Sequence, residues 1–74
     1  MNIDYLKEFV VLADNGSFSG AAEVLFLSQS SLSKHIKALE QELDVLLFRR
    51  TTRCLELTDE GEVFLSYARR ISCL

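Results

Sequence analysis

The side chains of this protein that are best suited to bind another molecule gather in the middle of the sequence. Five of the eight lysines and arginines follow Gln29 within a short stretch, namely Lys34, Lys37, Arg49, Arg50 and Arg53. Lysine and arginine neutralise phosphates, and a glutamine can form two hydrogen bonds with the edge of an adenine. Such a stretch is compatible with contacts to a nucleic acid. Taken alone, the lysines could equally form a solvated helix face and the arginines could protect a strand edge from aggregation, so the elements that carry them have to decide.

The overall charge points the other way. The 74 residues carry a formal net charge of -3 and an isoelectric point near 5.0, whereas phosphate binding requires cations. The acids Asp4, Glu8 and Asp14 precede the basic stretch, and Asp59, Glu60 and Glu62 follow it. Because the charges are separated along the chain, we expect a basic surface on an acidic body.

Two helices are predicted ahead of the basic stretch. The first ends at Asn15-Gly16, and its apolar face leaves out Tyr5 and Leu12, which suggests that this helix contacts a second surface as well. That face consists of Ile3, Leu6, Phe9, Val10 and Ala13. Ser19 is expected to cap a second, short helix whose inner side carries Ala21, Ala22 and Leu25. Since alanines let helices approach closely, this helix should cross a neighbour at short range.

A third, longer helix should carry the basic residues. The chain breaks at Phe26-Leu27, and Ser28 is a good N-cap. The buried positions repeat every three or four residues, at Leu32, Ile36, Leu39 and Leu43. The opposite face carries Ser30, Lys34, Lys37 and Gln41, with Ser33 on the flank. A short helix, a turn and a longer helix with a basic outer face is the helix-turn-helix arrangement, whose second helix enters the major groove of DNA.

A hairpin and a final helix are predicted to follow. The polar tip from Arg49 to Arg53 is flanked by the apolar residues Leu47, Phe48, Cys54, Leu55 and Leu57. Thr58 should cap the last helix, in which Phe64, Tyr67, Ile71 and Leu74 repeat with the spacing of a coiled coil. This stripe could pack on the first helix as ordinary core. Its periodicity up to the end of the sequence favours contact with a second chain instead, with Arg69 and Arg70 beside the seam.

Other classes of protein are disfavoured. The sequence has no proline and no repeat, which indicates one domain, and no apolar run approaches the ~20 residues of a membrane span. No secretory signal is visible at the start, so a cytoplasmic location is expected. Cys54 and Cys73 lack the spacing of a zinc or redox site, and we expect no metal and no cofactor. No acid is placed in sequence to orient His35, so we expect a packed neutral imidazole and no enzyme.

Taken together, these residues resemble a known family. The matching positions are Phe9 through Ser19, Ala21-Ala22 with Leu25, Leu27-Ser28-Gln29, Leu32-Ser33-Lys34 with Ile36, Leu39 and Glu40, Leu47-Phe48 with Arg50-Thr51, and Leu57-Thr58 with Gly61. This pattern is similar to the N-terminal domain of the LysR-type transcriptional regulators of bacteria. The match covers nearly the whole chain at consistent spacing, which makes it far more specific than a lone helix-turn-helix pattern.

The resemblance implies a mainly α, winged helix-turn-helix fold with a three-helix core, a hairpin wing and a C-terminal linker helix that forms a dimer. Residues 1–58 would be the DNA-binding domain and residues 59–74 the start of the linker helix. Gln29, Ser33 and Lys34 match base- and backbone-contacting positions of the family, and Arg50 and Arg53 match basic wing positions. Ser30 and Lys37 complete the predicted DNA-binding set. Phe64, Tyr67, Ile71 and Leu74 form the predicted dimer interface.

The sequence departs from the family pattern at four positions. Ser30 stands where proline is common, Asp44 and Thr52 stand where glycine is common, and Arg49 replaces a frequent acid. Family members also continue into a ligand-sensing domain, which would hold any small-molecule effector. The chain is thus either a fragment of a longer regulator or a natural truncation. For a truncated chain, a second hypothesis is a protein-interaction module that pairs with a full-length regulator through its last helix.

Overall fold

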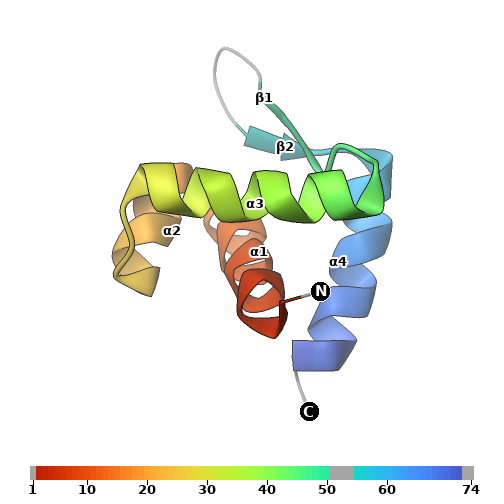
Figure 1. Cartoon of the computed structure of the whole chain (residues 1–74), viewed down its shortest axis with the longest axis horizontal. Coiled ribbons are helices and arrows are strands. Elements are labelled where there is room, and N and C mark those ends of the chain that lie inside the picture. The colour runs from red at the N-terminus through yellow and green to blue at the C-terminus, as the bar shows by residue number, and fades with distance from the viewer. Residues whose placement is uncertain (1, 51–54, 73–74) are drawn as a thin grey trace.

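A computed structural model describes residues 2–50 and 55–72, and their fold is mainly helical. Figure 1 shows the order of the elements: α1 (Ile3–Asn15), α2 (Phe18–Leu25), α3 (Gln29–Leu43), β1 (Phe48–Arg50), β2 (Leu55–Leu57) and α4 (Asp59–Ser72). In that view α3 runs across the molecule, with α2 and α4 toward its two ends and the hairpin above it. The predicted architecture of three core helices, a hairpin and a final helix is confirmed.

Polar caps and left-handed residues set the limits of the helices. Ser28 Oγ accepts from the Ser31 amide at 3.1 Å at the start of α3, as predicted. The prediction for α2 was wrong, because Ser17 and not Ser19 is its N-cap and accepts from the Gly20 amide at 3.1 Å. Gly16 ends α1 with a φ of 77°, a conformation that glycine adopts easily.

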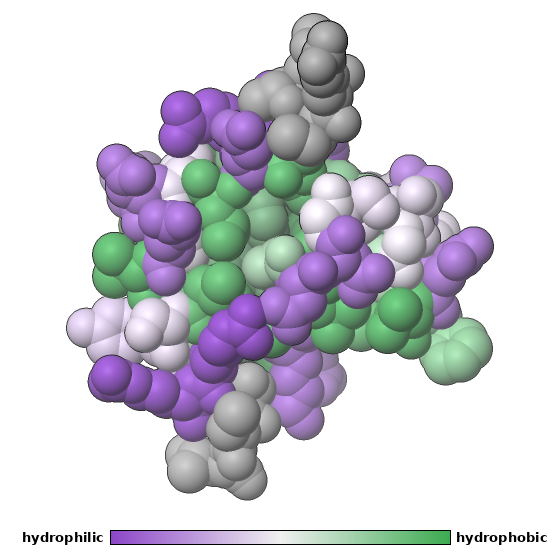
Figure 2. Space-filling model, turned by 180° about the vertical axis from the view of Figure 1, so that it is seen from behind, coloured by the Kyte–Doolittle hydropathy of each residue, from purple (hydrophilic) through white to green (hydrophobic). Residues whose placement is uncertain are grey.

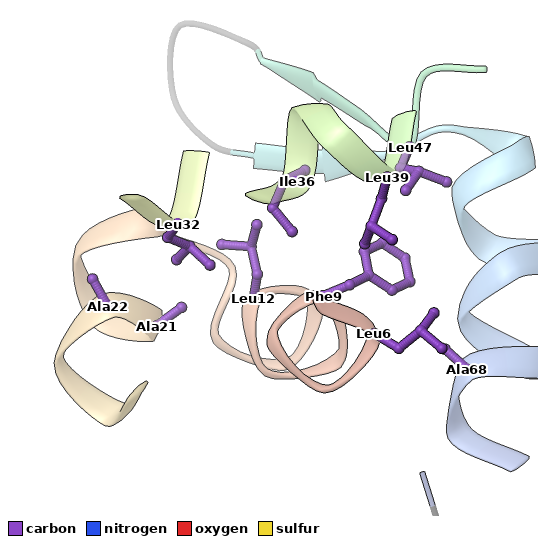
Figure 3. Packing of buried hydrophobic residues seen from close by; sticks show 10 residues of the cluster. All are labelled: Leu6, Phe9, Leu12, Ala21, Ala22, Leu32, Ile36, Leu39, Leu47 and Ala68. Atoms are coloured by element: carbon purple, nitrogen blue, oxygen red, sulfur yellow. The ribbon is translucent and has the colours of Figure 1, made fainter. Parts of the chain in front are cut away.

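Helix α1 is the centre of the hydrophobic core. It packs against α2, α3 and α4, and Figure 3 shows its side chains directed toward those of α3 and toward Ala68 of α4. The predicted apolar face of α1 was therefore partly wrong: Leu12 is fully buried, whereas Ile3 is half exposed. A helix with neighbours on several sides buries more than one stripe of residues, which explains the position of Leu12.

The remaining core positions follow the predicted spacing. Leu32, Ile36 and Leu39 of α3 are buried, and Leu43 packs against their cluster from the edge. Ala21 and Ala22 are buried on α2. Because these methyl groups occupy little space, the short helix can lie close to α1 and α3.

The hairpin is antiparallel, and its base is tied to the start of α4. Phe48 pairs with Leu57, and Arg50 pairs with Leu55. The Thr58 amide donates to the carbonyl of Leu47 at 3.0 Å, and Thr58 Oγ1 accepts from the Gly61 amide at 2.9 Å, as its predicted role as N-cap requires. No helix within residues 2–50 and 55–72 is long and apolar enough to cross a membrane.

Candidate DNA-binding surface

The outward face of α3 presents the predicted polar and basic side chains. Gln29, Ser30, Lys34 and Lys37 are exposed, and Ser33 is half-buried on the flank. The first turn is ordered by its own hydroxyl groups, since Ser28 Oγ hydrogen-bonds Ser31 Oγ at 2.9 Å and Ser30 Oγ at 3.3 Å. The exposed face of α3 therefore offers a row of hydrogen-bond donors and two cations. The opposite face packs into the core through Leu32, Ile36 and Leu39, which holds the helix in place.

Glu40 fastens the base of the hairpin to α3. Its Oε2 accepts from the amides of Leu47 and Phe48 at 2.8 and 3.3 Å. Both amides lie at the point where the chain turns into β1, so this carboxylate links the strand to the helix that precedes it. The sequence analysis used Glu40 only as a family match, and a single sequence carries no signal for these contacts, which join residues seven and eight positions apart across the end of α3.

Arg50 lies beside α3. Its guanidinium carbon is 4.8 Å from the centre of the Phe18 ring at the start of α2, which is within the range of a cation–π contact. The two side chains line one side of a recess of about 200 Å³, which also borders Ser33, Ile36, Lys37, Glu40 and Phe48. The structure thus brings Arg50, Lys37 and Ser33 together, whereas Arg53 lies outside the described residues.

His35 does have an acidic partner, contrary to the sequence-based expectation. Its Nδ1 lies 2.6 Å from Oε1 of Glu8, and its ring stacks on Tyr5 with 4.2 Å between ring centres and 12° between planes. Glu8 is buried, and both partners belong to α1. The contact joins residues that are 27 positions apart, so local patterns could not predict it. Because the pair lies between α1 and α3, it holds the orientation of α3 on the body of the domain.

Helix α4 leaves apolar side chains uncovered. Val63 is 59% exposed, Tyr67 57% and Ile71 43%. Figure 2, which shows the molecule from behind, has hydrophobic groups over much of the face, with hydrophilic groups at its edges and in a band that crosses it. An open groove of about 440 Å³ runs between the end of α3 and α4, lined by Leu43, Val45, Asp59, Glu60, Val63, Phe64 and Tyr67.

The predicted dimer stripe is divided between the core and this surface. Phe64 is half-buried, with its ring 5.2 Å from that of Phe9, and also borders the groove. Tyr67 and Ile71 are exposed, and Leu74 lies outside the described residues. Beside the stripe, Arg69 forms an ion pair with Asp14 of α1 at 2.5 Å. Helix α4 is thus attached to α1 along one side and open along the other.

The comparison with known families identifies the chain. The model described as bacterial regulatory helix-turn-helix protein, lysR family, matches residues 3–62. The chain belongs to the LysR family. Its sequence is 44% identical over 71 residues to the uncharacterized HTH-type transcriptional regulator YxjO of Bacillus subtilis and 49% identical over 72 residues to a probable RuBisCO transcriptional regulator of Thalassiosira pseudonana. These matches cover 96% and 97% of the chain but 24% of each relative.

Solved LysR structures match the fold closely. The DNA-binding domain of BenM in complex with catB site 1 DNA superimposes with a TM-score of 0.94 at 36% identity, covering 99% of this chain and 81% of that one. The DNA-binding domain of CbnR in complex with DNA gives a TM-score of 0.91 at 41% identity, covering 96% and 82%. The chain is therefore a LysR-type helix-turn-helix DNA-binding domain, homologous to domains solved on DNA, in a family of non-enzymatic regulators.

Proposed function

We propose that this chain binds double-stranded DNA in a sequence-specific manner and acts in transcription regulation. The observation that carries the proposal is the outward face of α3, which exposes Gln29, Lys34 and Lys37 in a domain homologous to domains solved on DNA. Residues 1–58 are proposed as the DNA-binding unit. The cytoplasm, where bacterial DNA lies, is the proposed location.

The contacts are divided by chemistry. Gln29 at the tip of α3 reads base edges in the major groove, assisted by Ser30 and Ser33, while Lys34 and Lys37 donate to bases or phosphates. Arg50 and Arg53 of the hairpin supply charge against the DNA backbone or the minor groove, where the potential is most negative. The cations thus provide affinity for all DNA, and Gln29 provides preference among sequences.

Dimer formation through α4 is the second part of the proposal. The uncovered Tyr67 and Ile71, with Phe64 beside the groove and Leu74 further along the sequence, would meet the same residues of a second copy. Residues 59–74 would then be the start of the linker helix. A two-fold dimer offers its recognition helices to successive major grooves, about 34 Å or a multiple of it apart.

Fluorescence anisotropy over a range of salt concentrations tests the division of contacts, with sites selected by this chain from random DNA. Gln29→Ala should lower the preference for the selected site and leave the salt dependence unchanged. Arg53→Ala should weaken binding to every sequence and reduce the slope of log affinity against log salt by about one unit. Equal losses on all sequences for both variants would reject the division.

A protein-interaction module is the alternative function, and the exposed groove beside α4 is the observation that favours it. In that case the chain would pair through α4 with a longer regulator that shares its fold and keep that regulator from DNA. A gel shift of the isolated chain separates the two functions. A salt-sensitive DNA complex supports the DNA-binding role, and its absence together with binding to a longer relative supports the interaction role.

A further inference from the structure

The recess between α2, α3 and β1 has the composition of an anion site. Two cations, Lys37 and Arg50, border it together with the hydroxyl of Ser33. Its volume of about 200 Å³ is smaller than the ~300–1,000 Å³ of most metabolite pockets, so a small group suits it better than a whole metabolite. A single phosphate, which accepts hydrogen bonds on several oxygens, matches both the size and the donors.

The carboxylate in this recess has its own partners. Glu40 borders the recess, and its Oε2 accepts from the backbone amides of Leu47 and Phe48. These hydrogen bonds direct the negative charge toward the base of the hairpin. The residues that line the recess carry two formal positive charges, on Lys37 and Arg50, and one negative charge, on Glu40.

Phe18 explains how Arg50 stays beside the recess. A free arginine side chain samples many rotamers, and ordering it opposes binding. The guanidinium of Arg50 lies over the Phe18 ring, 4.8 Å from its centre, and Phe18 is itself packed against the hydrophobic core. The aromatic face restricts the arginine before any ligand arrives and leaves its planar N–H groups available at the edge.

We infer that this recess binds one phosphate of the DNA backbone, held jointly by Lys37, Arg50 and Ser33, and that Phe18 is the positioning residue for Arg50. The inference rests on the proposed DNA binding and adds two statements to it. The two cations share a single phosphate, and an aromatic residue of α2 that is not among the predicted DNA contacts contributes to affinity.

The salt dependence of binding counts the neutralised phosphates, at about 0.9 units of slope for each. If Lys37 and Arg50 share one phosphate, Lys37→Ala and Arg50→Ala should each change the slope by well under one unit, because the other cation remains. The double variant should change it by about one unit. Changes of about one unit for each single variant and about two for the double variant would overturn the shared site.

Substitutions of Phe18 test its positioning role. Phe18→Leu should weaken DNA binding about two- to fivefold, the range of an exposed cation–π contact, and should cause no further loss when combined with Arg50→Ala. Phe18→Tyr keeps an aromatic face and should bind as the wild type does. Val10→Ala is the matched control, since it trims a half-buried core side chain of α1 that does not line the recess and belongs to neither the predicted DNA contacts nor the predicted dimer interface.

The outcomes separate this inference from the proposed function. If the wild type forms no salt-sensitive DNA complex, both fail. If the wild type binds DNA and Phe18→Leu binds it equally well, the positioning role alone is overturned. The same holds if Phe18→Leu lowers DNA affinity by the same factor in the wild type and in the Arg50→Ala variant. If Phe18→Leu and Val10→Ala lower thermal stability and DNA affinity alike, the loss reflects folding and Phe18 has no role at the recess.

Discussion

Gly61 lies where α4 passes closest to the preceding chain, and replacing it by alanine is the sharpest test of this packing. A methyl carbon at that position would lie 2.1 Å from the carbonyl oxygen of Leu47 and 3.0 Å from Cδ2 of Leu57. Contacts shorter than 3.0 Å essentially do not occur, so the carbonyl would have to retreat by about 0.9 Å. That oxygen accepts from the Thr58 amide at 3.0 Å, and its displacement would weaken this hydrogen bond as well.

The expected loss of stability follows from two destabilising contributions and one stabilising contribution. Overpacking costs ~1–3 kcal/mol, and a weakened hydrogen bond costs ~0.5–1.5 kcal/mol. Alanine recovers at most ~1 kcal/mol of helix propensity. We expect Gly61→Ala to lose about 2 kcal/mol, which in a domain of this size lowers the melting temperature by about 8–16 °C. Thermal unfolding followed by circular dichroism measures the change.

Gly20→Ala provides the matched control for this prediction. Its methyl carbon would meet Ser17 Oγ at 3.0 Å and Asn15 Oδ1 at 3.1 Å; both belong to exposed side chains, and a shift of a few tenths of an ångström relieves these contacts without removing the Ser17 cap. We expect this variant to be neutral or up to ~1 kcal/mol more stable, because helix propensity then dominates. A melting temperature of Gly61→Ala at or above that of the wild type would refute the close approach of α4 to the Leu47 carbonyl.

Two further predictions concern α3. Asp44 ends this helix with a φ of 57°, so Asp44→Gly should relieve strain and raise stability by about 1 kcal/mol in thermal unfolding; an unchanged or lower melting temperature would contradict this explanation. Glu8→Ala should cost about 1–3 kcal/mol in urea denaturation, because it leaves Nδ1 of the part-buried His35 without its partner at 2.6 Å. Glu8→Gln retains an acceptor and should lose less, and equal losses for the two variants would mean that packing, and not the hydrogen bond, stabilises the pair.

Local signals in the sequence were sufficient to predict most of the fold. Ser28 precedes a run whose apolar residues repeat every three or four positions, and one helix satisfies both features. The end of α1 at Asn15-Gly16 was also predictable from local sequence, since glycine adopts the left-handed conformation at low cost. The sequence was ambiguous where two residues could perform one role. Ser17 and Ser19 can both cap α2, and only the packing of Phe18 into the helix decides for Ser17.

The parts that the sequence could not predict depend on contacts between elements. Leu12 lies off the predicted apolar face, which indicated a second contact surface, but only the assembled fold shows that α1 has neighbours on several sides and buries Leu12 completely. The partners Glu8 and His35 are 27 positions apart, and Phe18 and Arg50 meet only once α2, α3 and the hairpin are assembled. The outward residues of α3 were predictable from their spacing. Their arrangement with Arg50 around one recess was not, and the DNA contacts themselves stay predictions.

The hydrogen bonds between Glu40 and the base of the hairpin have a consequence for which DNA sites the domain would prefer. The Leu47 and Phe48 amides are hydrogen-bonded to Glu40 of α3, and Arg50 stacks on Phe18 of α2, so α3 and β1 are held at a fixed spacing. If DNA binds to both elements as proposed, its backbone would have to match that spacing. Base pairs that the protein does not touch would then be selected by how easily they bend or narrow the groove, so flexible steps at fixed distances from the contacted bases would become part of the operator.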